Sequence, residues 1–257
     1  MDAIVLAGAP NDGRLERVAP DVGWEALIPL GGRPMISYVV DALTASRSVK
    51  RIIVVGPGAA LRAVLPEAVE VAEAGEGMID NILIGTRLIA DGRRVLIVTS
   101  DVPLLTARAV DDFLQRCSGR EADVYYPIVT KDENERYLPG VQRTYVRLKD
   151  GTFTGGNLVL LAPQVVEHGK QLIEQAIAMR KKPWQLSRML GFRFIVKFFL
   201  HKLDLAEIEA QVGDVLGFSG AAIVSPFPEV GIDVDKPSDL EMVRALVEQA
   251  NRRIGPG

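Results

Sequence analysis

The sequence predicts an α/β protein with a doubly wound, mostly parallel sheet. Short runs of apolar, β-favouring residues alternate with segments whose apolar residues recur at helical spacing. The clearest run, residues 95–99, ends in Ser100-Asp101-Val102-Pro103 and precedes a helical pattern from Thr106 to Cys117. A strand that is apolar throughout is typical of a parallel sheet covered by helices on both faces.

The first half of the chain repeats this alternation of strand and helix. Apolar runs predict strands at residues 3–7, 51–55 and 69–72. Pro34 suits the first turn of a helix that continues to Leu43, and further helices are expected at residues 59–65 and 77–90. This order of elements up to residue 117 favours a Rossmann-like core.

The second half changes character after a predicted strand at residues 123–128. A polar segment, residues 130–142, precedes alternating sequence at 143–148 and 152–154, and Asp150-Gly151 suits the turn of a β-hairpin. Further strands are expected at residues 158–161 and 221–224, and helices from Pro163 to about Arg180 and from Leu240 to Ala250. We expect a single domain, residues 1–257, with this hairpin and a helical insert at about 180–217.

Composition excludes several classes of protein. The chain has 257 residues and a net charge of −3, which does not suggest a nucleic-acid partner. Its single cysteine, Cys117, rules out an internal disulfide, fits a reducing cytoplasm and is expected to serve packing. The first residues lack the basic region of a signal peptide, and no apolar run reaches the ~18 residues of a membrane span.

Three aspartates are candidates for metal binding. Asp101 follows a predicted central strand, at the sheet edge where α/β proteins bind ligands, and a carboxylate there is a natural ligand for Mg²⁺. The alternative is an aspartate that only caps a turn or helix. Asp233 and Asp235 alternate along an extended segment, so their carboxylates share a face and repel unless a cation or basic group lies between them. Turn formation is the alternative for either residue.

The loop from Gly8 to Leu15 is a candidate phosphate site. A glycine-containing loop after a strand offers backbone N–H groups to phosphates, and Arg14 and Arg17 could add charged contacts. The loop has neither the Gly-Lys-Ser/Thr of a P-loop nor the Gly-x-Gly-x-x-Gly of a dinucleotide site. A plain turn between strand and helix is therefore an equal alternative.

Two further groups of residues could face ligands. Asp80 and Asn81 begin the helix predicted at 77–90 and could contact a base or ribose, or merely cap the helix. Gly155 and Gly156, followed by Asn157, precede a strand and would allow close approach of the backbone to a ligand.

Residues 180–217 form a basic, aromatic-rich stretch. Such a sequence could lie as a helix on a membrane surface. We favour an inserted helical subdomain instead, because its apolar positions are so dense that much of it should be buried. The residues concerned are Trp184, Phe192, Phe194, Phe198 and Phe199 among Arg188, Arg193, Lys197 and Lys202.

Taken together, the motifs resemble those of a known family. The chain looks like the nucleotidyltransferases of the MobA-like (molybdenum-cofactor guanylyltransferase-like) NTP transferase superfamily, which share the GT-A-like fold. The resemblance spans residues 3 to about 245 but leaves out the insert at 180–217. The matching segments, in family order, are residues 4–8 (Ile-Val-Leu-Ala-Gly), 26–36, 100–104 (Ser-Asp-Val-Pro-Leu), 155–157 (Gly-Gly-Asn) and 233–240.

The resemblance implies a Mg²⁺-dependent transfer of an NMP group from an NTP to a small phosphorylated acceptor, with release of pyrophosphate. Arg14 and Asp101 would be catalytic, and Asp101, Asp233 and Asp235 would hold the metal ion. Gly155, Gly156 and Asn157 would line the acceptor pocket. The implied nucleotide-binding residues are Leu6, Ala7, Gly8, Ala9, Gly13, Arg14, Asp80, Asn81 and Ser100.

Glu25 departs from the family pattern. Relatives usually carry lysine before Ala-Leu-Ile-Pro-Leu, where it offsets phosphate charge, and a glutamate reverses the sign unless Arg14, Arg17 or Arg33 compensates. One alternative is therefore a catalytically silent nucleotide-binding or regulatory protein on the same fold. The basic, aromatic stretch motivates another, a membrane-surface transferase with a lipid-linked acceptor.

Overall fold

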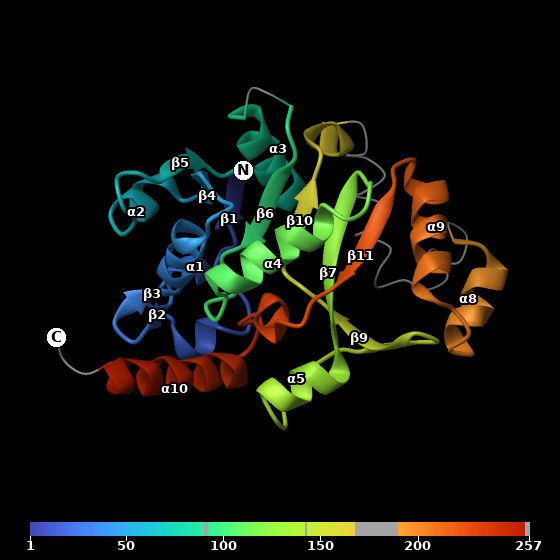
Figure 1. Cartoon of the computed structure of the whole chain (residues 1–257). Coiled ribbons are helices and arrows are strands. Elements are labelled where there is room, and N and C mark those ends of the chain that lie inside the picture. The colour runs from blue at the N-terminus through green and yellow to red at the C-terminus, as the bar shows by residue number, and fades with distance from the viewer. Residues whose placement is uncertain (90–91, 142, 168–189, 255–257) are drawn as a thin grey trace.

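The computed structural model describes residues 1–89, 92–141, 143–167 and 190–254. Its centre is a nine-stranded sheet flanked by helices (Figure 1). One half is parallel, in the order β5 (Glu70–Glu73), β4 (Arg51–Gly56), β1 (Asp2–Leu6) and β6 (Val95–Thr99). The predicted α/β class with a mostly parallel sheet is confirmed.

The other half of the sheet mixes strand directions. β10 (Leu158–Leu161) runs antiparallel between β6 and β7 (Val124–Thr130), and β11 (Gly220–Val224) pairs with β7 in parallel. β9 (Gly151–Gly155) pairs with the far end of β7 and with β8 (Val146–Leu148), which confirms the predicted hairpin. A separate two-stranded ladder joins β2 (Pro29–Leu30) and β3 (Arg33–Pro34).

Alternating side chains of the strands build a core on each face of the sheet. Ala3 and Val5 of β1 pack on the face covered by α1 (Met35–Ala45) and α4 (Ala107–Cys117). Ile4 packs on the opposite face, under α3 (Met78–Arg87). Because successive residues of a strand point to opposite faces, an apolar run fills both layers.

The remaining elements lie at the edges. α2 (Gly58–Arg62) follows β4, and α9 (Leu205–Leu216) contacts β11. α10 (Pro237–Ile254) runs along the bottom of Figure 1, and its apolar residues pack against the segment after β1. α10 begins at Pro237, three residues before the predicted start, because proline is well accommodated in the first turn of a helix.

Two stretches differ from expectation. The polar segment at 130–142 contains a helix, α5 (Lys131–Tyr137), whose N-cap Thr130 accepts a hydrogen bond from the backbone N–H of Glu133. The described part of the predicted insert forms α8 (Phe192–Phe199) and α9, and α8 buries none of its residues, contrary to the burial expected there. Residues 180–189, and most of the helix expected after Pro163, lie outside the described ranges. Within those ranges, no helix is long and apolar enough to cross a bilayer.

Candidate active site

Asp101 lies at the carboxyl end of the parallel half of the sheet. β6 pairs with β1 so that Thr99 is opposite Leu6, and the Ser100 N–H donates to the Leu6 carbonyl at 3.1 Å. The next residue, Asp101, is half-buried and accepts a hydrogen bond from the Thr99 hydroxyl. The sequence-predicted position of Asp101 at a strand end is therefore found.

The two C-terminal aspartates come to the same place through the backbone. The Val234 N–H donates to the Asp101 carbonyl at 2.9 Å, and Val234 itself is buried. Asp233 and Asp235 flank it, and each meets an arginine. Asp235 Oδ2 lies 3.4 Å from Arg14 Nη1, and both of these side chains are about 70% exposed.

Arg143 holds Asp233 more firmly. Its guanidinium forms an ion pair with the Asp233 carboxylate and donates a second hydrogen bond to the Asp233 carbonyl at 3.3 Å. The Arg143 side chain is only 11% exposed, so this pair is largely shielded from water. Asp233 thus has a largely shielded cationic partner, whereas Asp235 has an exposed one.

The carboxylates perturb one another. Burial, together with the charges of Asp233 and Asp235, raises the pKa of Asp101 to about 6, against the lowering effect of the Thr99 hydroxyl. Burial also raises the pKa of Glu25, and the negative charges of Asp101, Asp235 and Asp12 raise it as well. This edge of the sheet is therefore an acidic site that favours a cation or a proton.

The donor set fits a hard divalent cation. Mg²⁺ is commonly held by one or two carboxylates together with substrate phosphates and water, so it does not require an all-protein cage. Asp101 and Asp235 offer such carboxylates. Among the described residues, no three His, Cys, Asp or Glu side chains converge as a metal cluster.

A hollow of about 270 Å³ opens beside Asp101. Its wall combines the loop after β1, the end of β6 and the start of α3, which brings together six of the residues predicted to bind nucleotide or metal: Leu6, Gly8, Ala9, Asn81, Ser100 and Asp101. Glu25 lines it too, so the residue that departs from the family pattern faces the same space. We call this hollow the Asp101 pocket.

Asn81 shapes the Asp101 pocket through the backbone. Its Oδ1 accepts a hydrogen bond from the Gly75 N–H at 2.8 Å, which fixes the turn that leads into α3. Gly8 approaches Asn81 so closely that a Cβ on Gly8 would lie 2.7 Å from the Asn81 amide nitrogen. The structure thus gives Asn81 a structural role at the wall of the pocket and explains the glycine after β1.

Four of the predicted nucleotide-binding residues do not line the Asp101 pocket, and neither do Asp233 and Asp235. Ala7 is buried, and its N–H donates to Val55 within the sheet. Asp80 lies in the first turn of α3, and Gly13 and Arg14 lie exposed in the loop that ends at Leu15. Arg14 instead forms an ion pair with Asp235.

The predicted acceptor residues line a neighbouring hollow of about 640 Å³. Gly156 and Asn157 contribute to it, together with apolar side chains of α3, α9 and the sheet, and it shares Leu6, Met78 and Thr99 with the Asp101 pocket. The backbone between β9 and β10 is fixed there, because the Gly156 and Asn157 N–H groups donate to Pro127 and Val230. Gly155 ends β9 without lining the hollow.

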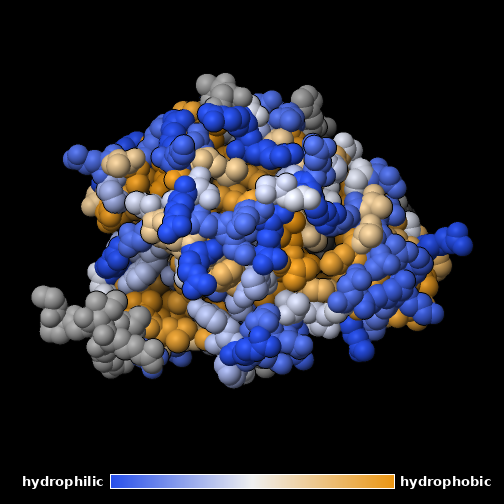
Figure 2. All heavy atoms as spheres, viewed as in Figure 1, coloured by the Kyte–Doolittle hydropathy of each residue, from blue (hydrophilic) through white to orange (hydrophobic). Residues whose placement is uncertain are grey.

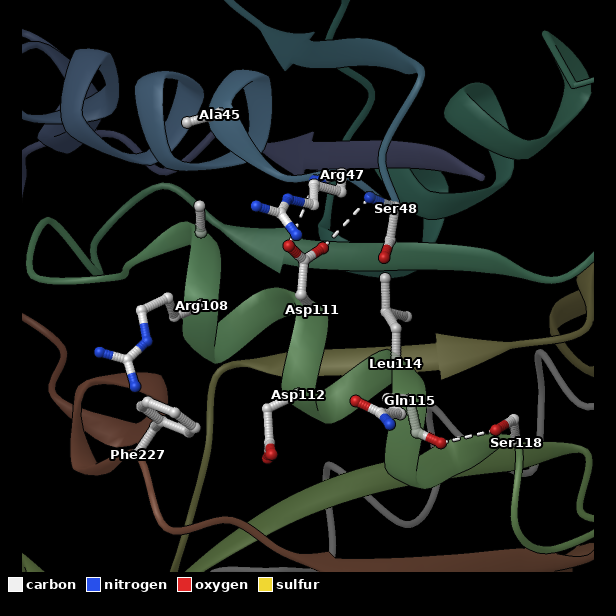
Figure 3. A pocket seen from close by; sticks show the side chains of 11 residues that line it. Ala45, Arg47, Ser48, Arg108, Asp111, Asp112, Leu114, Gln115, Ser118 and Phe227 are labelled. Atoms are coloured by element: carbon white, nitrogen blue, oxygen red, sulfur yellow. Dashed lines mark hydrogen bonds between the residues drawn. The ribbon is translucent and has the colours of Figure 1, made fainter.

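A larger hollow, about 950 Å³, lies elsewhere, between the end of α1 and α4 (Figure 3). Asp111 points into the turn after α1, where it accepts hydrogen bonds from the Ser46 hydroxyl and the Arg47 and Ser48 N–H groups. Its carboxylate is thus used to hold a turn. Cys117, also on α4, is buried, and burial raises its thiol pKa to about 12, which fits the predicted packing role.

A comparison with family models matches residues 3–185 to the MobA-like NTP transferase domain. The chain belongs to this family. The match covers most of the chain. It confirms the family identified from the sequence, and the predicted enzyme class, nucleotidyltransferase, is confirmed with it.

Curated relatives resemble part of this MobA-like domain in sequence. Curated sequence relatives include the bifunctional protein GlmU of Acidithiobacillus ferrooxidans, 35% identical over 120 residues, and that of Thermotoga maritima, 35% identical over 141 residues. These alignments cover 44% and 53% of this chain but only 25% and 30% of the relatives. The chain therefore matches about a quarter to a third of the length of these proteins.

Solved structures extend the likeness to almost the whole chain. A hypothetical transferase from Thermus thermophilus is 38% identical, with a TM-score of 0.81 and coverage of 93% of this chain and 98% of that one. A CMP:2-keto-3-deoxy-manno-octonic acid synthetase solved with CTP has a TM-score of 0.62 over 97% of this chain and 99% of its own, but is only 14% identical. At that identity the second match shows a common fold alone.

Sequence reasoning missed two contributors to the site of this MobA-like domain. Gly75, Gly77 and Met78 complete the wall of the Asp101 pocket, and the Gly-Glu-Gly sequence before a predicted helix was an available signal. The local pattern predicts Arg143 only as part of a strand. Its contact with Asp233 crosses 90 residues of sequence, and no local pattern indicates it.

Proposed function

We propose that this chain transfers an NMP group from an NTP to a small phosphorylated acceptor and releases pyrophosphate. The observation that carries the proposal is the backbone hydrogen bond from Val234 to Asp101, which joins two aspartate-bearing loops beside a pocket walled by the loop after β1. Membership of the NTP transferase family and the neighbouring hollow at Gly156 and Asn157 support two substrates side by side.

In the proposed reaction, an oxygen of the acceptor attacks the α-phosphorus of the NTP, and the bond between that phosphorus and the pyrophosphate oxygen breaks. Asp101 and Asp235 would hold Mg²⁺ with the phosphates, and Asp233 would lie beside them, paired with Arg143. When bound, the ion would neutralise phosphate oxygens. Arg14 would leave Asp235 to contact the triphosphate, and no protein nucleophile is required.

The test is pyrophosphate release with each of the four NTPs, Mg²⁺ and a panel of sugar phosphates and other phosphorylated acceptors. We expect release with at least one pair of substrates and its loss in Asp101→Asn. Release that persists in Asp101→Asn would contradict the assigned role of this carboxylate. Calorimetric titration of each NTP with Mg²⁺ accompanies the assay, so that binding is measured separately from turnover.

Glu25 favours a second candidate function, a nucleotide-binding protein without transfer activity. Its carboxylate lines the Asp101 pocket and adds negative charge where phosphates would lie. This alternative predicts NTP binding with no pyrophosphate release across the whole acceptor panel.

A further inference from the structure

α8 turns its apolar side away from the protein. Phe192, Val196 and Phe199 are 78%, 38% and 66% exposed, and their spacing of four and three residues places them on one face of the helix. Leu200, which follows the helix, is 56% exposed. Large apolar side chains grouped in this way mark an interaction surface rather than ordinary surface scatter.

The opposite side of α8 attaches it to the rest of the molecule. Phe194 packs against a small buried cluster that contains Phe153 of β9 and Leu203, and Lys197 forms an ion pair with Glu207 of α9. Among the described residues, these contacts lie on the side of α8 away from Phe192, Val196 and Phe199. The apolar face is exposed because the helix is attached to the protein by its other side. Figure 2 shows hydrophobic and hydrophilic residues side by side at the right-hand edge, where α8 and α9 lie in Figure 1.

The charged residues of α8 and of the turn after it are basic, and one of them, Lys197, is paired with Glu207 of α9. Residues 190–203 carry Arg193, Lys197 and Lys202 and no aspartate or glutamate, within a chain whose net charge is −3. Arg193 and Lys202 are exposed. A second copy of the chain stacked face to face through α8 would bring these like charges together, which is unfavourable. An anionic surface that also accepts apolar side chains satisfies both features.

We propose that α8 docks this protein on an anionic lipid bilayer, lying in the plane of the interface. Phe192, Val196, Phe199 and Leu200 would enter the boundary between headgroups and acyl chains, and Arg193 and Lys202 would contact anionic headgroups. An eight-residue helix is about 12 Å long, which suits lying on a membrane rather than crossing it. This inference does not depend on the proposed transfer reaction.

Docking in this way would hold the acceptor side of the molecule at the lipid surface. Phe153, which belongs to the same buried cluster as Phe194, lies two residues before Gly155, where the backbone turns toward Gly156 and the second hollow. The β8–β9 hairpin thus connects the docking helix with the region proposed for the acceptor.

The test is sedimentation of the full chain with vesicles of phosphatidylcholine alone or with 30 mol% phosphatidylglycerol. We expect the wild type to pellet with the anionic vesicles at low salt, to pellet much less at 0.5 M NaCl, and to stay in solution with phosphatidylcholine alone. Phe192→Ser/Phe199→Ser should weaken partitioning by about tenfold or more. Arg193→Glu/Lys202→Glu should weaken it on anionic vesicles to a similar extent.

The control is Val18→Ser/Val64→Ser, which removes two exposed apolar side chains elsewhere and should pellet like the wild type. Thermal melting checks that each variant is folded. No pelleting with anionic vesicles at low salt would overturn the proposal, and so would equal pelleting of the Phe192→Ser/Phe199→Ser variant. Light scattering gives the oligomeric state of the wild type and of that variant. A wild-type dimer that the variant converts to a monomer, with no vesicle binding, would assign the face to a second copy instead.

Discussion

Asp101 and Asp111 are two aspartates whose environments have opposite effects on stability. Burial raises the pKa of Asp101 to about 6, whereas hydrogen bonds from Ser46 and Ser48 overcome burial and lower that of Asp111. The folded state therefore binds a proton at Asp101 more readily than the unfolded chain, and its stability falls as the pH rises from 3.8 to about 6. For Asp111 the pH dependence of stability is opposite. The stabilisation that its carboxylate contributes is lost as the pH falls through the lowered pKa.

We therefore expect Asp101→Asn to stabilise the fold at pH 7 by roughly 1–3 kcal/mol, because it removes a charge that burial disfavours. This gain in stability should shrink toward pH 4. The same substitution should lower the rate of pyrophosphate release about a hundredfold or more. Asp111→Asn is the matched control, and it should destabilise by about 1–2 kcal/mol at pH 7. Urea unfolding at a series of pH values measures the free energy of unfolding of both variants. A loss of stability in Asp101→Asn at pH 7 would contradict the expected stabilisation.

Glu25 would oppose phosphate binding in the proposed nucleotide site, the Asp101 pocket. Replacing it with lysine would remove its repulsion with Asp101 and supply a cation there. Glu25→Lys should tighten NTP binding by about tenfold, as measured by calorimetry at low salt. Glu67→Lys, an exposed change of the same charge remote from the pocket, should leave the affinity within about twofold. Equal affinities in the two variants would place the phosphates elsewhere.

Arg143 distinguishes the roles of Asp233 and Asp235. Asp235→Asn should raise the Mg²⁺ concentration needed for half-maximal activity by about tenfold or more, because Asp235 has only an exposed partner. Asp233→Asn should act chiefly on stability, with a loss of about 1–3 kcal/mol, since it leaves the shielded Arg143 charge unpaired. The double variant Arg143→Gln/Asp233→Asn should recover part of that loss. A larger change in Mg²⁺ requirement for Asp233→Asn than for Asp235→Asn would reverse the assignment.

At the scale of elements, the bend between β9 and β10 depends on glycine. A Cβ at Gly156 would lie 2.8 Å from Pro127 Cγ and 3.1 Å from the Val230 carbonyl oxygen. Gly156→Ala should therefore destabilise the protein by about 1–3 kcal/mol and weaken acceptor binding. Gly213→Ala, inside α9 with no atom nearer than 3.7 Å, should instead stabilise by up to about 1 kcal/mol. Thermal melts of both variants measure these signs, and a neutral Gly156→Ala would show that the bend can relax.

The elements that the sequence predicted correctly are those with strong local patterns. The strand before Asp101, the helix capped by Thr106 and the Asp150-Gly151 hairpin each follow from residues that are neighbours in sequence. α5 was missed because its charged residues resemble a loop, although ion pairs one turn apart, such as Lys131–Glu135, stabilise it. The exposure of α8 could not be predicted either, since an apolar stripe does not say which side meets the body of the protein.

At the scale of the whole molecule, the site joins parts of the chain that are far apart. Arg14 and Asp235 are 221 residues apart, and Arg143 and Asp233 are 90 apart. The aspartates could be placed at strand and segment ends from sequence, but these pairings could not, because they depend on how α10 packs. Leu15, in the loop after β1, belongs to the same buried cluster as Val234 and the apolar face of α10.

This cluster should therefore couple folding to substrate binding. Val243 of α10 is fully buried in this cluster. Val110 of α4 is equally buried, but in a different cluster, with residues of α1 and the sheet. Val243→Ala and Val110→Ala should each lower the free energy of unfolding by about 1–3 kcal/mol. Only Val243→Ala should also weaken Mg²⁺–NTP binding, by severalfold at 25 °C in calorimetry, because it loosens the packing that sets Arg14 and Asp235 against Asp101. Equal affinities in the two variants, at equal loss of stability, would mean that the aspartates keep their positions without support from α10.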